Sequence, residues 1–263
     1  MPTATALRLK IEHALETRFP AALSPAPRTV RDVAMTGIDA VDRLLDGGIP
    51  VGAICELIGP ASSGRTSLAL AYLARRTEQE LVCAWIDACD AFDPESAAAA
   101  GVTLHQLLWV RCSDSNQKNR SEMREQKLAR NKPWTRLDQA LRATDLLLQA
   151  AGFAVIILDL GDFLPEHVRR IPLATWFRFR QAAERTRSSL VVLAHTPCAQ
   201  SSPAVVLHCA PMCAEDAGSA VLERFTFSVR RERQRFAPST AAARKPPGST
   251  WCATGAWTED KRA

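Results

Sequence analysis

The chain has 263 residues, of which 47% are hydrophobic, and it carries a formal net charge of +5. This length supplies one substantial core and favours one large domain or at most two. No segment approaches the roughly 18 uninterrupted apolar residues of a membrane helix, and the charged N-terminus lacks the pattern of a secretory signal, so we expect a cytoplasmic protein with no membrane contact.

The first thirty residues predict a short helix followed by a linker. Leu7, Ile11 and Leu15 repeat at helical spacing before Pro20, and a proline-rich connector comes next. We interpret residues 1–30 as a unit that packs either on the main domain or on a partner subunit.

From residue 31 to residue 236 the pattern predicts one α/β core. Strands that are apolar throughout alternate with helices, which is typical of a mostly parallel sheet flanked by helices on both faces. The predicted strands are 53–59, 81–87, 107–111, 153–160 and 189–195, and the predicted helices are 37–45, 66–80, 94–102, 136–152 and 172–188. Alternation over 221–236 predicts an antiparallel C-terminal edge strand.

Residues 237–263 are rich in Pro, Ser, Thr and Ala, so we expect a disordered tail, in which Trp251 or Trp257 could dock. His208, Cys209 and Cys213 are close in sequence, but they lack the four-ligand spacing of a zinc site. We therefore expect no zinc.

Residues 59–66, GPASSGRT, form the phosphate-binding pattern G-x-x-x-x-G-K-[ST], with arginine in place of lysine. The pattern follows a predicted strand and opens a predicted helix, so its N–H groups are expected to hold phosphate oxygens. The candidate nucleotide-binding residues are Gly59, Ser62, Ser63, Gly64, Arg65, Thr66 and Ser67. An arginine keeps the charge but brings a wide planar fork, so phosphoryl transfer should suffer more than binding.

Two residues are candidates for a magnesium site. Thr66 occupies the position whose hydroxyl would ligate Mg²⁺. Asp159 ends the most apolar strand, where a carboxylate would hold Mg²⁺ through water. The alternatives are that Asp159 only caps a turn, or that Asp162 takes its role. The sequence thus predicts ATP and Mg²⁺ as cofactors.

Two basic segments are candidates for contact with DNA or a partner. Residues 112–136 form a polar insert whose basic side chains include Lys118, Arg120, Arg124, Lys127 and Arg130. The second segment holds Arg230, Arg231, Arg233 and Arg235. Either segment could instead be solvated surface. No helix of a base-reading type is evident, so any DNA contact should be independent of sequence.

Three stretches carry a resemblance to a known family. GPASSGRTSLAL resembles the phosphate loop of the RecA recombinases, and AWIDACDAFDPESAAAAGVTLHQLLWVR resembles the stretch that follows it there. VIILDL corresponds in order and spacing. The resemblance covers residues 8–230, is specific over 36–111, and implies a RecA-like P-loop core.

The chain departs from that family at the chemical positions. The RecA glutamate that polarises the attacking water aligns with Cys89, which is no carboxylate base. The ring that stacks on adenine aligns with Ser96, although Asp93 remains as an adenine contact, and the γ-phosphate sensor aligns with His195. Together with Arg65, these changes imply weak or absent ATP hydrolysis, with no confident catalytic residue.

The segments that align with the DNA-binding loops of RecA are short, and residues 196–205 replace its glycine-rich second loop. No counterpart of the large C-terminal domain of RecA follows. A small RecA-like chain of this kind resembles the ImuA family. That resemblance implies error-prone translesion synthesis in the SOS response, beside an ImuB-like Y-family polymerase homologue and an error-prone polymerase. The alternatives are an active DNA-stimulated ATPase and a regulator of RecA filaments.

Overall fold

A computed structural model of the chain describes residues 29–112, 133–216, 222–238 and 248–254. The helices are α2 (Asp39–Leu44), α3 (Arg65–Thr77), α4 (Pro94–Ala99), the 3₁₀ turn Leu104–Gln106, α5 (Pro133–Ala150), α6 (Pro165–Val168) and α7 (Leu173–Thr186). The strands are β1 (Thr29–Arg31), β2 (Val33–Ala34), β3 (Ile49–Pro50), β4 (Ile54–Ile58), β5 (Cys83–Asp87), β6 (Leu107–Arg111), β7 (Val155–Asp159), β8 (Ser189–Ala194), β9 (Val205–Asp216), β10 (Leu222–Gln234), β11 (Phe236–Pro238) and β12 (Gly248–Thr254).

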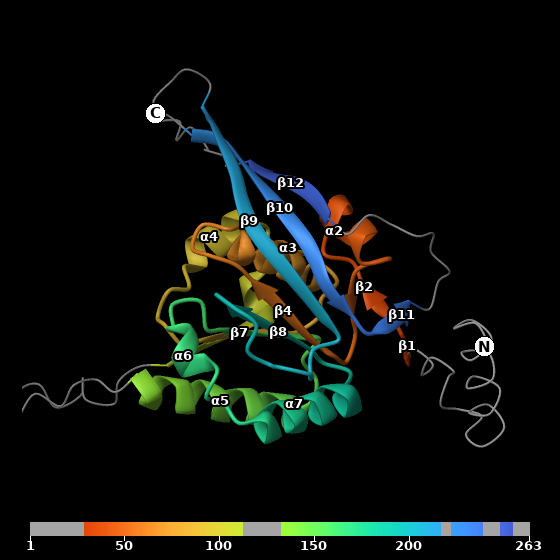
Figure 1. Cartoon of the computed structure of the whole chain (residues 1–263), viewed down its shortest axis with the longest axis vertical. Coiled ribbons are helices and arrows are strands. Elements are labelled where there is room, and N and C mark those ends of the chain that lie inside the picture. The colour runs from red at the N-terminus through yellow and green to blue at the C-terminus, as the bar shows by residue number, and fades with distance from the viewer. Residues whose placement is uncertain (1–28, 113–132, 217–221, 239–247, 255–263) are drawn as a thin grey trace, which may run out of the picture.

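One eight-stranded sheet in the order β12-β10-β9-β4-β8-β7-β5-β6 organises the fold (Figure 1). The pairings from β9 to β6 are all parallel, as the fully apolar strands predicted. The α/β class with a mostly parallel sheet is therefore confirmed. All five strands and all five helices of the predicted parallel layer are present, with ends shifted by up to three residues.

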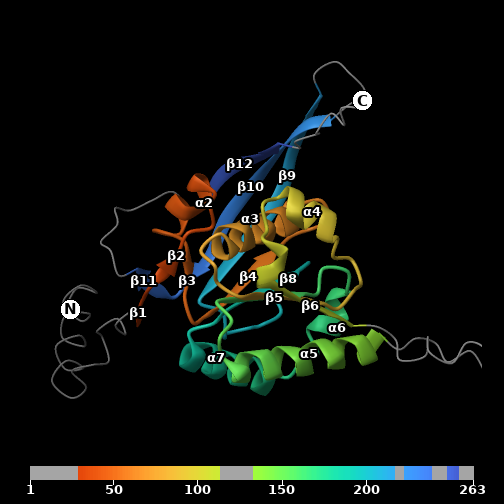
Figure 2. The same cartoon turned by 180° about the vertical axis from the view of Figure 1, so that it is seen from behind.

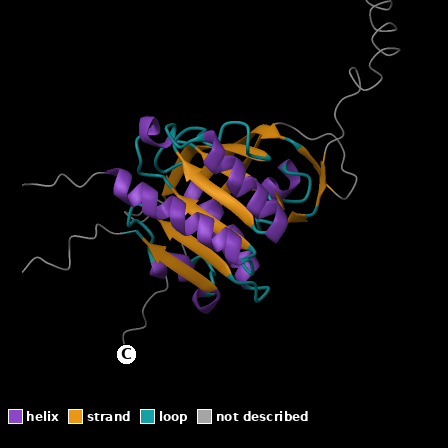
Figure 3. Ribbon diagram, turned by 90° about the horizontal axis from the view of Figure 1, so that it is seen from below, coloured by secondary structure: helices purple, strands orange, loops and turns teal. Residues whose placement is uncertain are grey.

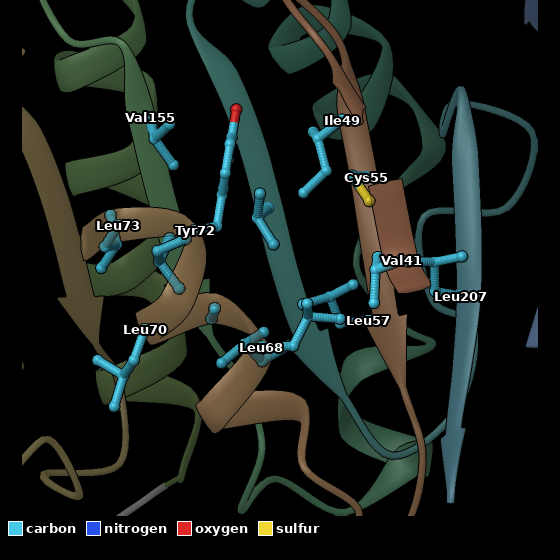
Figure 4. Close-up of a cluster of buried hydrophobic side chains, with 14 of the residues drawn as sticks. Val41, Ile49, Cys55, Leu57, Leu68, Leu70, Tyr72, Leu73, Val155 and Leu207 are labelled. Atoms are coloured by element: carbon cyan, nitrogen blue, oxygen red, sulfur yellow. The ribbon is translucent and has the colours of Figure 1, made fainter. Parts of the chain in front are cut away.

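Helices cover both faces of the sheet (Figures 1 and 2). One core cluster joins the sheet to α2, α3 and α4, and Figure 4 shows part of it beneath α3, with Leu57, Leu68 and Tyr72. The second cluster joins the other face to α5, α6 and α7, and α5 and α7 lie side by side there (Figure 3). Strand β4 contributes residues to both clusters, because Cys55 belongs to the first cluster and Ile54 to the second.

The C-terminal side of the sheet is antiparallel, as expected, but it extends further than predicted. Strand β10 pairs with β9 on one side and β12 on the other, so the segment 221–236 is not the edge strand. The edge is β12, which lies within the predicted disordered tail, and that prediction is wrong for residues 248–254. Strand β9 was not predicted.

Trp251 fixes β12 to the sheet. Its side chain is 8% exposed, and its ring centroid lies 4.9 Å from that of Phe227 on β10. Replacing Trp251 with alanine should cost about 2 kcal/mol of unfolding free energy, less than the ~3–5 kcal/mol of a central core tryptophan, because an edge strand can adjust. Denaturant titration would measure this cost. Thr250→Ala, exposed on the same strand, is the control and should change stability little; equal effects of the two would contradict the role of Trp251.

Several expectations lie outside the described residues: the N-terminal helix, most of the insert 112–136 with its five named basic residues, and Trp257. The division of the chain at residues 30 and 236 stays a prediction. Within the described ranges, no helix combines the length and the apolar character needed to span a membrane.

Candidate nucleotide site

The loop 59–64 connects β4 to α3 at the carboxyl end of the parallel strands, as the sequence predicted. Gly64 precedes the helix with φ +84°, a left-handed conformation that favours glycine. A Cβ atom on Gly64 would lie 2.7 Å from the ring of Phe227, and one on Gly59 would lie 2.2 Å from the carbonyl oxygen of Cys209. Both glycines are therefore required by the close packing of β9 and β10 behind the loop.

Two polar atoms of the loop region are buried without a hydrogen-bond partner in the described structure: Oγ of Ser63 and Nη1 of Arg65. Buried donors without partners are uncommon in native proteins. Arg65 is 9% exposed. Burial lowers the pKa of its guanidinium, and the charge of Asp159 is the main opposing influence. These groups suit an anionic ligand held by the loop.

Asp159 ends β7 and faces the loop. Its Oδ1 accepts a hydrogen bond of 2.9 Å from the N–H of Gly161. Burial raises the pKa of the carboxyl to about 6, and the neighbouring Asp87 and Asp162 add to the rise. Asp162 is exposed, so of the two candidates Asp159 is the one enclosed by the site.

A cavity of about 240 Å³ lies beside Arg65 and Asp159. Six residues of its lining are positions that the sequence analysis singled out: Arg65, Thr66, Asp93, Ser96, Asp159 and Asp162. The apolar part of the lining was not predicted from the sequence, and it consists of Leu70, Trp85, Ala91, Phe92 and Leu193. Among the other predicted or aligned positions, the following do not line it: Gly59, Ser62, Ser63, Gly64, Ser67, Cys89 and His195. The cavity thus combines a charged end at the phosphate loop with an aromatic end, as a nucleotide site requires.

The aromatic wall is fixed by the buried carboxylate of Asp87. That carboxylate accepts hydrogen bonds from the N–H groups of Ala91 and Phe92, at 3.0 and 3.1 Å, and from Nε1 of Trp109 at 3.3 Å. The ring of Phe92 lies 4.9 Å from that of Trp85. Asp87 is therefore a structural residue that shapes the wall, which explains a buried charge at this position.

Asp93 has a structural role as well. Its carboxylate caps α4 by accepting the N–H groups of Glu95 and Ser96, and it also accepts the hydroxyl of Ser96. These hydrogen bonds, the hydroxyl of Ser96 first, lower the pKa of Asp93. Ser96 is thus directed toward the cap of its own helix, at the position where the resemblance expects a stacking ring.

The two positions that the resemblance aligns with a catalytic base and a phosphate sensor hold Cys89 and His195. Cys89 is half-buried, and burial raises the pKa of its thiol to about 12, so the thiol stays neutral at physiological pH. His195, half-buried, follows β8 directly. Neither side chain supplies the carboxylate that general-base activation of water would use here.

The segment after His195 is held in place by buried and basic side chains. Oε1 of Glu56, on β4, accepts the N–H groups of Cys198 and Ala199 at 2.8 and 2.7 Å. Two of the predicted contact arginines donate to the same segment: Arg233 to the carbonyl of Gln200 and Arg235, at 2.7 Å, to that of Ser201.

The other two arginines of this group also have partners within the chain. Arg231 donates to the carbonyl of Leu44 at 2.8 Å, and Arg230 lies 3.3 Å from Glu232. Arg230 and Arg235 remain exposed. The cluster Arg230, Arg231, Arg233 and Arg235 therefore connects β10 to neighbouring segments and leaves two side chains at the surface.

The donor types of the site fit a magnesium ion, which in nucleotide sites is held by one or two carboxylates together with phosphate oxygens. Asp159 and the exposed hydroxyl of Thr66 are the residues that would hold it, and the ion would neutralise phosphate charge there. In the described part of the chain, no group of three or more His, Cys, Asp or Glu side chains is arranged to hold a metal ion.

Comparisons with known proteins agree with this geometry. Residues 21–165, more than half of the chain, match the RecA N-terminal domain family. The chain is 35% identical over 129 residues to Protein RecA of Ectopseudomonas oleovorans, which covers 49% of this chain and 31% of that protein. It is 32% identical over 137 residues to Protein RecA of Crocosphaera subtropica, and this match covers 52% of this chain and 33% of that protein. The chain thus spans about a third of the length of these relatives.

Among solved structures, the RadB recombinase superposes with a TM-score of 0.54 at 17% identity, covering 83% of this chain and 94% of that one. At this identity the likeness shows the fold alone.

Proposed function

This chain belongs to the RecA family, and from that premise we propose that it is an accessory protein of the bacterial DNA damage response, similar to the ImuA family. In this proposal it binds ATP at the loop 59–66, hydrolyses it weakly or not at all, and acts through protein partners and sequence-independent DNA contact in error-prone translesion synthesis.

The observation that carries the proposal is a phosphate loop that keeps its glycines and a cation at Arg65, beside chemically altered positions that the resemblance aligns with catalytic groups. Ser63 and Arg65 offer buried donors without partners, whereas the thiol of Cys89 has a pKa of about 12 and carries no charge near neutral pH. Loss of one well-placed catalytic group typically costs a factor of about 10² to 10⁴ in rate. Binding without turnover follows from this combination.

An active DNA-stimulated ATPase is the second candidate, because the loop and Asp159 are both in place. That function predicts phosphate release that rises with single-stranded DNA and falls by about 10²-fold or more in Thr66→Ala, since Thr66 is the candidate metal ligand. Thr250→Ala, exposed on β12 and outside the cavity lining, is the control. A low signal that is equal in the parent and in Thr66→Ala would support the accessory role instead.

Partner binding tests the translesion part of the proposal. A purified ImuB-like Y-family polymerase homologue should form a stable complex with this chain in size-exclusion chromatography, with or without nucleotide. Any DNA binding should weaken steeply with salt and be the same for unrelated sequences, because phosphate contacts carry it. Absence of a complex with the polymerase homologue, in a protein shown to be folded, would overturn the translesion assignment.

A further inference from the structure

The phosphate loop places an arginine, rather than a lysine, in the same cavity lining as the carboxylate that would hold a metal. We propose that the guanidinium of Arg65 bridges nucleotide phosphate and Asp159, and that nucleotide binding to this chain is therefore nearly independent of Mg²⁺. This inference rests on the proposed nucleotide-binding function and names the residue that replaces the metal's charge.

The side chain of Arg65 lies inside the site. The residue opens α3 and its side chain is 9% exposed, so the guanidinium is held inside the site. A Cβ atom on Gly161 would lie 3.0 Å from Oδ1 of Asp159 and 3.6 Å from Nη2 of Arg65. The carboxylate and the guanidinium therefore lie against the same glycine, at the carboxyl end of β7.

One edge of the Arg65 guanidinium has donors that are unused among the described residues. Nη1 is buried and has no hydrogen-bond partner among the described residues, and Arg65 lines the cavity together with Thr66 and Asp159. A guanidinium has five N–H donors in a rigid plane, with which it can serve two acceptors on different edges. With the Nη2 side near Asp159, the Nη1 side remains for a phosphate oxygen.

The charges of the side chains that line the cavity support the same role for Arg65. Among the described residues that line the cavity, Arg65 is the single cation, and it faces the carboxylates Asp93, Asp159 and Asp162. Asp93 is engaged as the cap of α4 and Asp162 is exposed to solvent. Asp159 is thus the buried negative charge that would repel a phosphate, and the guanidinium offsets part of it at the place where a divalent ion would otherwise be needed.

A lysine at this position would act differently. Its compact ammonium reaches the phosphates as a point charge, which leaves the carboxylate of Asp159 uncompensated unless a metal lies between them. Gly161 leaves room for the wider group, because any side chain there would begin within 4 Å of both the guanidinium and the carboxylate.

The test compares the dissociation constant of a fluorescent ADP analogue in excess Mg²⁺ and in EDTA. The parent protein should bind with less than about a threefold difference between the two conditions, whereas Arg65→Lys should bind at least about tenfold more weakly in EDTA. Arg75→Lys, exposed on the same helix, is the control and should behave as the parent does. Circular dichroism would establish that the variants are folded.

The results of this test distinguish failure of the proposed role of Arg65 from failure of the proposed nucleotide binding. Parent binding that weakens about tenfold or more in EDTA, or an Arg65→Lys variant that stays independent of metal, would overturn the role of Arg65 while leaving nucleotide binding intact. No binding by the folded parent in either condition would overturn the proposed nucleotide-binding function, and this inference with it.

Discussion

Alanine in place of Gly64 is expected to lower the free energy of unfolding by about 2 to 5 kcal/mol. The backbone has φ +84° there, and a left-handed residue with a Cβ atom costs about 1 to 2 kcal/mol. The added Cβ would also lie 2.7 to 3.0 Å from three ring atoms of Phe227, and forcing a packed ring aside costs typically about 1 to 3 kcal/mol more. Denaturant titration measures the sum.

Gly152 provides a matched control for the backbone part of this cost. Its φ is +85°, nearly that of Gly64, but a Cβ atom there would have nothing within 4 Å. Gly152→Ala should therefore report the left-handed penalty alone, and the difference between the two variants should report the contact with Phe227. Equal losses at the two positions would mean that β10 does not support the phosphate loop from behind.

Asparagine in place of Asp159 is expected to stabilise the protein near pH 7. The pKa of this carboxyl is raised from 3.8 to about 6 by burial, so the folded state binds the proton more tightly than the unfolded state does. Unfolding free energy therefore falls as the pH rises from about 4 to about 6, and the full cost is present above that window. At roughly 1.4 kcal/mol per pKa unit, the charge costs about 2 to 3 kcal/mol at neutral pH.

Melting temperatures of Asp159→Asn and of the parent, measured at pH 4 and pH 7.5, test this expectation. The variant should melt higher at pH 7.5, and the gain should largely disappear at pH 4, where the parent carboxyl is protonated. Asp162→Asn, close by but exposed, should give no comparable pH-dependent gain. A gain at Asp159 that does not change with pH would show that burial of the charge is not its cause.

The parallel layer could be predicted because its strands are short apolar runs that mostly alternate with helical patterns, and such patterns are local. On the antiparallel side only β10 could be predicted, since β9 contains Pro211 and polar residues and β12 reads GSTWCAT, which is indistinguishable from a polar tail without its partner β10. The four-residue α6 begins at Pro165 and buries only Val168, too little for a periodic signal.

The candidate site also has a part that could be predicted from the sequence and a part that could not. The loop and Asp159 are recognisable because motif and strand end are contiguous in sequence. The packing of Phe227 and Cys209 against the glycines joins residues about 150 positions apart, so no local pattern indicates it. One signal was available: Asp93 before Pro94 is a helix start pattern, which the cap of α4 bears out.

A titration with labelled ATP, with and without single-stranded DNA, distinguishes nucleotide binding from hydrolysis when bound nucleotide and released phosphate are followed in the same sample. The proposed phosphate binding at Ser63 and Arg65, without a carboxylate at Cys89, predicts stoichiometric binding with little or no phosphate release, unchanged by DNA. Release that rises strongly with single-stranded DNA would contradict the account and establish an active ATPase.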